Sequence, residues 1–201
     1  KEEIAGQKGE PEDPIVGQPI GAEAIAADLG FEMISYDADA LIAIGRRQLA
    51  WGEAEMKKAA KEMGHGDDWK AAMDEVKAQH MPPGEQAELI AEIGREATRF
   101  VTERELLTVP PLSQATWRLT IMSPEQLKTI PYAAYSSQRM LVAYAQQSMS
   151  QADKLMVMRG NNRHFTRLVT PHELIPGHHL QRFYLARYNS HRQVFGTPFY
   201  T

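Results

Sequence analysis

The sequence contains no cysteine, no long apolar run and no excess of positive charge. The absence of cysteine among 201 residues excludes disulfide bonds and thiolate metal ligands. No apolar stretch approaches the roughly 20 residues that a membrane-spanning helix needs, so no membrane span is expected. Lysine and arginine number 22 against 26 aspartates and glutamates, for a net charge of −4. This balance argues against a nucleic-acid partner, because phosphate binding requires clustered cations.

The composition that is present is that of an ordinary globular protein. Hydrophobic residues make up 43% of the chain and charged residues 24%, which predicts a soluble protein with a core in one domain or two small ones. The chain opens with Lys1-Glu2-Glu3, which does not resemble a signal peptide. The localisation therefore stays open, with secreted and periplasmic proteins among the options.

Three segments of the chain differ in their residue patterns. Residues 1–20 are rich in glycine and proline without periodicity, which predicts an irregular N-terminal segment. Residues 21–106 have helical periodicity and predict a helical subdomain. Residues 107–201 predict a small β patch followed by a helix that holds the histidine-rich residues 170–181. We therefore expect a mainly α fold with a small β patch (α+β).

The boundaries of individual elements follow from capping residues, helix stops and alternation. Asp37 and either Asp67 or Asp68 are expected N-caps. Helices are expected over about residues 22–29, 38–63, 68–79, 85–105, 150–159 and 164–188, and strands over about 116–122, 132–135 and 140–144.

The chemistry of the chain is concentrated in residues 170–181, Thr-Pro-His-Glu-Leu-Ile-Pro-Gly-His-His-Leu-Gln, which hold three of its seven histidines. In zinc peptidases, two histidines hold the metal and the glutamate beside the first one acts on the water that the metal activates. His172 and Glu173 fit the first histidine and the general base. Imidazole and carboxylate ligands suit Zn²⁺, with Mn²⁺ and Fe²⁺ as alternatives.

The spacing to the second histidine does not fit a regular helix. His178 lies six positions after His172, a turn of roughly 240° that would point the two side chains apart. His179 returns to the same face but lies roughly 10 Å along the axis, too far for one ion. A bulge or break is therefore required, and Pro176 and Gly177 are the residues that produce one.

The stretch His-Glu-Leu-Ile-Pro-Gly-His-His resembles the H-E-x-x-P-G-H-H motif of the DUF885 family, a group of predicted zinc metallopeptidases placed with the gluzincins. The resemblance extends over most of the chain. It includes three further segments, the helix at 36–63 with Gly45-Arg46-Arg47, residues 107–110 and residues 158–162. It implies a gluzincin-like, helix-rich metallopeptidase fold, of which this chain is the N-terminal and central part.

The resemblance also implies roles for the residues of the motif. His172 and His178 correspond to the metal ligands, with His179 as the alternative second ligand or as a hydrogen-bond donor near the substrate. Glu173 corresponds to the general base. A third ligand, a glutamate, is implied in a Glu-Gly-Trp-Ala-Leu-Tyr segment after Pro198-Phe199, and thus beyond the end of this sequence.

These considerations predict a zinc-dependent peptidase that hydrolyses peptide bonds with a metal-activated water and a glutamate base. We expect this fragment to be nearly inactive without its C-terminal remainder, whether continuous or supplied as a second chain. Two other functions stay open: a metal-dependent hydrolase of another amide or ester, and a non-catalytic helical metal-binding or interaction module.

Contacts to a peptide substrate are expected from residues near the motif. Gluzincins hold the substrate backbone against an edge strand, and the strand at 140–144 is the candidate, with a buried core strand as the alternative. The candidate side chains are Tyr144, Arg159, Asn161, His164 and His179. A polar helix–helix turn explains the three from Arg159 to His164 equally well. Arg182 and Arg187 are interpreted as solvated charges, with carboxylate anchors as the alternative.

Overall fold

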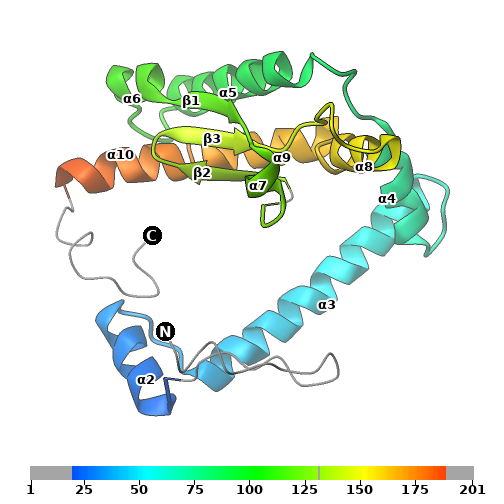
Figure 1. The fold of residues 1–201 in the computed structure, drawn as a ribbon. Helices are drawn as coiled ribbons and strands as arrows, with labels where there is room; N and C mark the ends of the chain where they lie inside the picture. The colour runs from blue at the N-terminus through cyan, green and yellow to red at the C-terminus, as the bar shows by residue number, and fades with distance from the viewer. Residues whose placement is uncertain (1–19, 131, 189–201) are drawn as a thin grey trace, which may run out of the picture. The chain divides into compact units, whose positions relative to one another are not determined.

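The computed structural model describes residues 20–130 and 132–188 (Figure 1). These residues divide into two compact units, one over residues 20–51 and the other over residues 52–188, with the division inside a long helix. The first unit holds α2 (Ala22–Phe31) and the first half of α3 (Ala38–Glu62). The predicted cap of α3 is confirmed, because the Asp37 carboxylate accepts a hydrogen bond from the amide of Ala40 at 2.7 Å.

The second unit begins with the end of α3 and three further helices. They are α4 (Trp69–Ala78), α5 (Gln86–Glu103) and α6 (Pro111–Thr116). Asp68 caps α4 through a 3.0 Å hydrogen bond from the amide of Ala71. The short α6 was not among the helices expected from the sequence.

The β patch is a three-stranded mixed sheet. Its strands are β1 (Arg118–Ile121), β2 (Ala133–Ser136) and β3 (Arg139–Val142), with the short α7 (Pro124–Leu127) between β1 and β2. The strand order is β1-β3-β2, with β3 parallel to β1 and antiparallel to β2. The expected edge strand at residues 140–144 is therefore wrong, because β3 is paired on both sides. Its alternative, a buried core strand, is the one observed.

Both faces of the sheet are covered. Met140 and Val142 point to one face, where they pack with Ile90 of α5 and with Leu174 beyond the end of α9 (Arg163–Glu173). Leu141 points to the other face, because successive strand residues alternate; the remaining residues of that cluster are Met122, Ala143, Leu127, Ile130 and Val157. Figure 1 shows α5 and α9 running beside the sheet.

The last helices carry the motif. They are α8 (Gln151–Gly160), α9 and α10 (His178–Tyr188). The helix expected over 164–188 is thus two helices, separated by the residues where the sequence requires a break. The fold is mainly α with a small β patch, as expected, and no helix in the described ranges is long and apolar enough to cross a membrane.

Candidate functional site

The first half of the motif lies on α9, whose start is fixed by a side-chain cap. The Asn162 side-chain oxygen accepts hydrogen bonds from the amides of His164 and Phe165, each at 3.0 Å, and so satisfies two of the free N–H groups of the first turn. The helix packs against α5 and β2. His172 and Glu173 are its last residues, so they stand at the end of an element that is anchored on two sides.

The chain leaves α9 at Leu174 and Ile175, and each of these side chains is 1% exposed. Leu174 packs with Ile90 and the sheet, whereas Ile175 packs in a separate cluster with Val101, Val109 and Leu180. A cis peptide bond joins Ile175 to Pro176. Because two consecutive side chains are buried in two different apolar clusters, packing holds the backbone of the break between α9 and α10 in one conformation.

Gly177 brings the second half of the motif back onto the first. Its amide donates a 2.9 Å hydrogen bond to the carbonyl of Pro171. A Cβ atom at this position would overlap the carbonyl oxygen of His172 and lie 2.6 Å from that of Pro171. Only glycine permits this approach of two backbone segments, and the approach places residue 178 beside residue 172.

His172, Glu173 and His178 form a cluster of potential metal ligands. Their ligand atoms all lie within 4.8 Å of one another. The two imidazole rings meet edge to face, with 4.7 Å between their centroids. His172 is exposed, His178 is half-buried and Glu173 is only 6% exposed. A glutamate this buried is unusual without a partner, and two imidazoles beside a carboxylate fit the donor set that zinc prefers.

His179 is not part of this cluster, and its ring forms hydrogen bonds with other parts of the protein. It is 1% exposed, with Nε2 2.7 Å from the Ser113 carbonyl and Nδ1 3.1 Å from the Tyr135 hydroxyl. Burial lowers the pKa of His179, while the bond to Ser113 acts in the opposite direction. The neutral ring therefore donates from Nε2 to Ser113 and accepts at Nδ1 from Tyr135.

Tyr135 links this buried histidine to the cluster. Its ring stacks on His178, with 6.3 Å between centroids and 26° between planes. Burial raises the pKa of Tyr135, opposed by a backbone hydrogen bond from Gln138 and by the charge of Arg182. The hydroxyl consequently stays protonated at neutral pH and can donate to His179.

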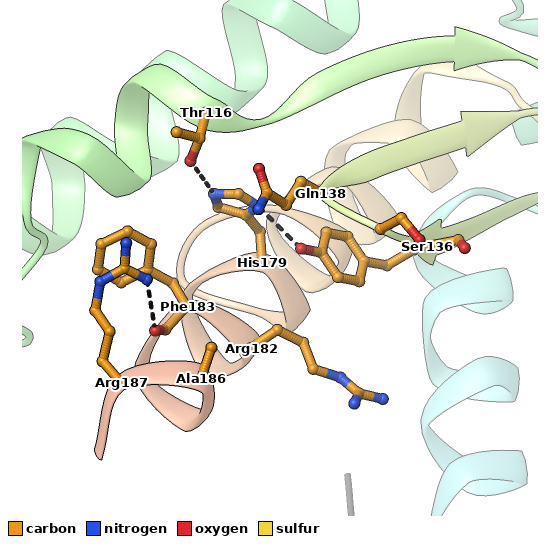
Figure 2. A pocket seen from close by; sticks show the side chains of 10 residues that line it. Thr116, Ser136, Gln138, His179, Arg182, Phe183, Ala186 and Arg187 are labelled. Atoms are coloured by element: carbon orange, nitrogen blue, oxygen red, sulfur yellow. Dashed lines mark hydrogen bonds between the residues drawn. The ribbon is translucent and has the colours of Figure 1, made fainter. Parts of the chain in front are cut away.

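A pocket of about 440 Å³ opens beside His179. Its walls come from the end of α6, the β2–β3 turn and one face of α10 (Figure 2). The lining residues are Thr116, Tyr135, Ser136, Ser137, Gln138, His179, Arg182, Phe183, Ala186 and Arg187. Of the substrate contacts expected from the sequence, only His179 lines this pocket.

Tyr144 and Asn161 make structural hydrogen bonds. The Tyr144 hydroxyl accepts from the amide of Gly84. The Asn161 amide is 2% exposed and donates to the carbonyl of Ala143 at 3.1 Å. Neither residue belongs to the ligand cluster or lines the pocket beside it.

Arg159 and His164 lie just before the motif. They contact α4 and Gln79, the residue that follows α4. Arg159 forms an ion pair with Asp74 at 3.1 Å, and His164 Nε2 lies 2.8 Å from the Gln79 side-chain oxygen. Both residues are likewise outside the cluster and the pocket. Their substrate roles therefore stay predictions from sequence, and the observed contacts are those of a helix–helix connection.

Sequence reasoning missed the residues that hold His179. Ser113 lies 66 positions and Tyr135 lies 44 positions before it. The alternation around residues 132–135 does indicate a strand, but nothing in the sequence places that strand beside the motif.

The comparison of this chain with protein families gives a match. The model of a family described as bacterial protein of unknown function (DUF885) matches residues 3–199. No curated protein and no solved structure gives a significant match. Since the family match spans nearly the whole chain, this chain belongs to the DUF885 family.

Proposed function

We propose that the cluster at the α9–α10 break is the water-activating centre of a zinc-dependent peptidase. The observation that carries the proposal is the convergence of His172, Glu173 and His178 within 4.8 Å in a segment whose spacing would separate them on a regular helix. The resemblance of the motif to gluzincins supports a peptide as the substrate.

In this proposal, His172 and His178 hold the metal through their imidazoles. Zinc, when bound, supplies Lewis acidity and makes water a nucleophile near neutral pH. Glu173 takes a proton from the attacking water and delivers it to the leaving amine. The oxygen of the water bonds to the carbonyl carbon, the C–N bond breaks, and the products are a carboxylate and an amine.

Catalytic zinc usually has three protein ligands. Among residues 20–130 and 132–188, the only potential ligand beside the two histidines of the cluster is Glu173, which has the position of the base. We therefore assign the third ligand to a part of the protein outside the described residues, as the resemblance implies. An alternative in which Glu173 itself is a ligand corresponds to a non-catalytic metal site.

The free edge of β2 is the proposed docking surface for the peptide backbone. In the described part of the chain β2 pairs with β3 alone, and it packs against α9. An extended peptide can add to such an edge through main-chain hydrogen bonds. This assignment replaces the strand at 140–144, whose hydrogen-bonding groups are used by its two neighbours.

Glu173→Gln in the complete protein tests the proposal. The amide keeps the shape of the side chain but cannot accept the proton, so peptide hydrolysis should fall by about 10²- to 10⁴-fold. Zinc content, measured by mass spectrometry, should not change. Glu92→Gln, at an exposed position of α5, is the matched control and should behave as the wild type.

Two results would contradict the proposed roles. Loss of zinc in Glu173→Gln would make Glu173 a ligand and favour the non-catalytic metal site. Unchanged turnover with zinc retained would remove Glu173 from the mechanism. Hydrolysis of esters or other amides, with no peptide cleaved, would favour the broader hydrolase.

A further inference from the structure

The described side chains that line the pocket beside His179 give it a positive charge. Among the described residues, the formally charged side chains that line it are both cations, Arg182 and Arg187 of α10. The other polar side chains in this described lining are neutral, and none of them is an aspartate or a glutamate. A concave site with cations and neutral donors is suited to an anionic group.

We propose that this pocket binds the C-terminal carboxylate of the peptide substrate, so that the protein is a carboxypeptidase. The inference rests on the proposed peptidase function and gives it a substrate class, peptides with a free C-terminus.

The arginines have the hydrogen-bond donors that a carboxylate needs. A guanidinium offers five N–H donors in a planar fork that matches the two oxygens of a carboxylate. The Arg187 guanidinium lies over the ring of Phe183, with 3.5 Å from its central carbon to the ring centroid, and donates one hydrogen bond to the Phe183 carbonyl at 3.1 Å. One such bond holds the group in place and leaves further donors. Figure 2 shows Arg182 and Arg187 extending from α10 on two sides of Ala186.

The β2–β3 turn adds neutral donors opposite α10. Ser137 and Gln138 have φ values of 48° and 65° and lie between the paired residues Ser136 and Arg139. A two-residue type I′ turn requires positive φ at both of these positions and is normally built from asparagine and glycine. Serine and glutamine place a hydroxyl and an amide at the pocket wall instead. These groups can donate to a carboxylate without adding charge.

The position of Arg182 relative to the cluster sets the length of the fragment released. Arg182 follows His178 by four residues, so it lies on the same face of α10 about 6 Å further along the axis. One extended peptide residue spans about 3.3–3.6 Å. A substrate whose scissile bond lies at the cluster and whose carboxylate lies at Arg182 therefore places one or two residues between them, and one or two residues should be released from the C-terminus.

The test compares two forms of one peptide on the complete, zinc-loaded protein. An N-acetylated tripeptide ending in phenylalanine is supplied as the free acid and as the C-terminal carboxamide. We expect kcat/KM for the free acid to exceed that for the amide by about ten- to a hundredfold, the effect of charge-assisted hydrogen bonds. Mass spectrometry should identify products shortened by one or two C-terminal residues.

Variants connect this preference to the pocket. Arg182→Gln should lower kcat/KM for the free acid to the level of the amide, with little effect on the amide itself. Arg182→Lys should recover part of the preference, because it restores the charge without the planar fork. Arg95→Gln, at an exposed position of α5, is the control and should keep the wild-type preference. Equal cleavage of acid and amide by the wild type, or equal losses on both in Arg182→Gln, would overturn the proposal.

A binding measurement separates this proposal from the peptidase proposal. In the Glu173→Gln variant, calorimetric titration with the same two peptides should show at least tenfold tighter binding of the acid. Adding Arg182→Gln should abolish the difference. If the wild type cleaves no peptide, the peptidase function fails, and this titration alone decides whether the pocket binds carboxylates. Equal affinities for acid and amide would refute the pocket assignment.

Discussion

At the scale of single residues, two adjacent histidines have different environments. His178 is half-buried and joins the ligand cluster. His179 is buried, and both of its ring nitrogens bind protein groups, Ser113 at 2.7 Å and Tyr135 at 3.1 Å. Their positions on α10 explain the difference, since neighbouring residues on a helix point about 100° apart. The structure thus favours His178 over His179 as the proposed second ligand.

Alanine substitutions at these two positions should affect different properties of the protein, zinc binding at His178 and stability at His179. His178→Ala should weaken zinc binding by more than about 100-fold, because even the loss of an outer hydrogen-bond partner of a ligand costs 10- to 100-fold. It should leave the stability of the zinc-free protein nearly unchanged. His179→Ala should instead lower the free energy of unfolding by about 2–4 kcal/mol, because it removes a buried ring and leaves Ser113 and Tyr135 without their partner.

Zinc competition with a chelating dye and urea denaturation measure the two effects. The account would be contradicted if His179→Ala lost zinc as completely as is expected of His178→Ala while its stability stayed unchanged. His179 would then be the ligand.

At the scale of elements, the break between α9 and α10 produces the site. Its geometry depends on glycine at 177, where a Cβ would overlap the His172 carbonyl oxygen, and on Leu174, which is 1% exposed. The constraint at Gly177 is steric, and the one at Leu174 is apolar packing. A single substitution at either residue tests one constraint without the other.

Gly177→Ala should destabilise the protein by about 3 kcal/mol or more and also weaken zinc binding, because the two backbone segments must move apart. Gly45→Ala is the matched control. Gly45 lies inside α3, and no atom of the described residues lies within 4 Å of an added Cβ, so the change should stabilise by about 0.5–1 kcal/mol. Urea denaturation measures both variants, and a Gly177→Ala protein as stable as wild type would refute the steric argument.

Leu174→Ala should cost about 2–5 kcal/mol, the usual range for a buried leucine. Leu168, which lies on the preceding α9 and is 75% exposed, is the control, and its change to alanine should have almost no effect. We further expect Leu174→Ala to reduce zinc affinity, since Leu174 directly follows the proposed base. Similar stability in the two variants would show that the break does not depend on this packing.

The elements also show what sequence can and cannot predict. Caps such as Asp37 and Asp68, and the break at Pro176 and Gly177, were predictable because each depends on the local chemistry of a few neighbouring residues. The short α6 was missed, since two prolines at its start indicate an extended segment as readily as a helix. The role of Tyr135 was beyond prediction, because it depends on a contact between residues 44 positions apart.

At the scale of the whole molecule, zinc should act as a stabilising ligand. A metal that binds only the folded state raises its stability by about 2.7 kcal/mol at 100 times the dissociation constant. Thermal unfolding of the complete protein should therefore shift upward by several degrees with zinc. The shift should vanish in a His172→Ala, His178→Ala double variant. A shift that persists there would place the zinc at another site.

The most direct test of the central claim is an anomalous difference map at the zinc absorption edge, from crystals of the complete protein grown with zinc. The account predicts one strong peak bonded to the imidazoles of His172 and His178, with the Glu173 carboxylate beside it and a third protein ligand from outside the described residues. A peak bonded to His179 would contradict the ligand assignment, and no peak near the α9–α10 break would contradict the metal centre itself.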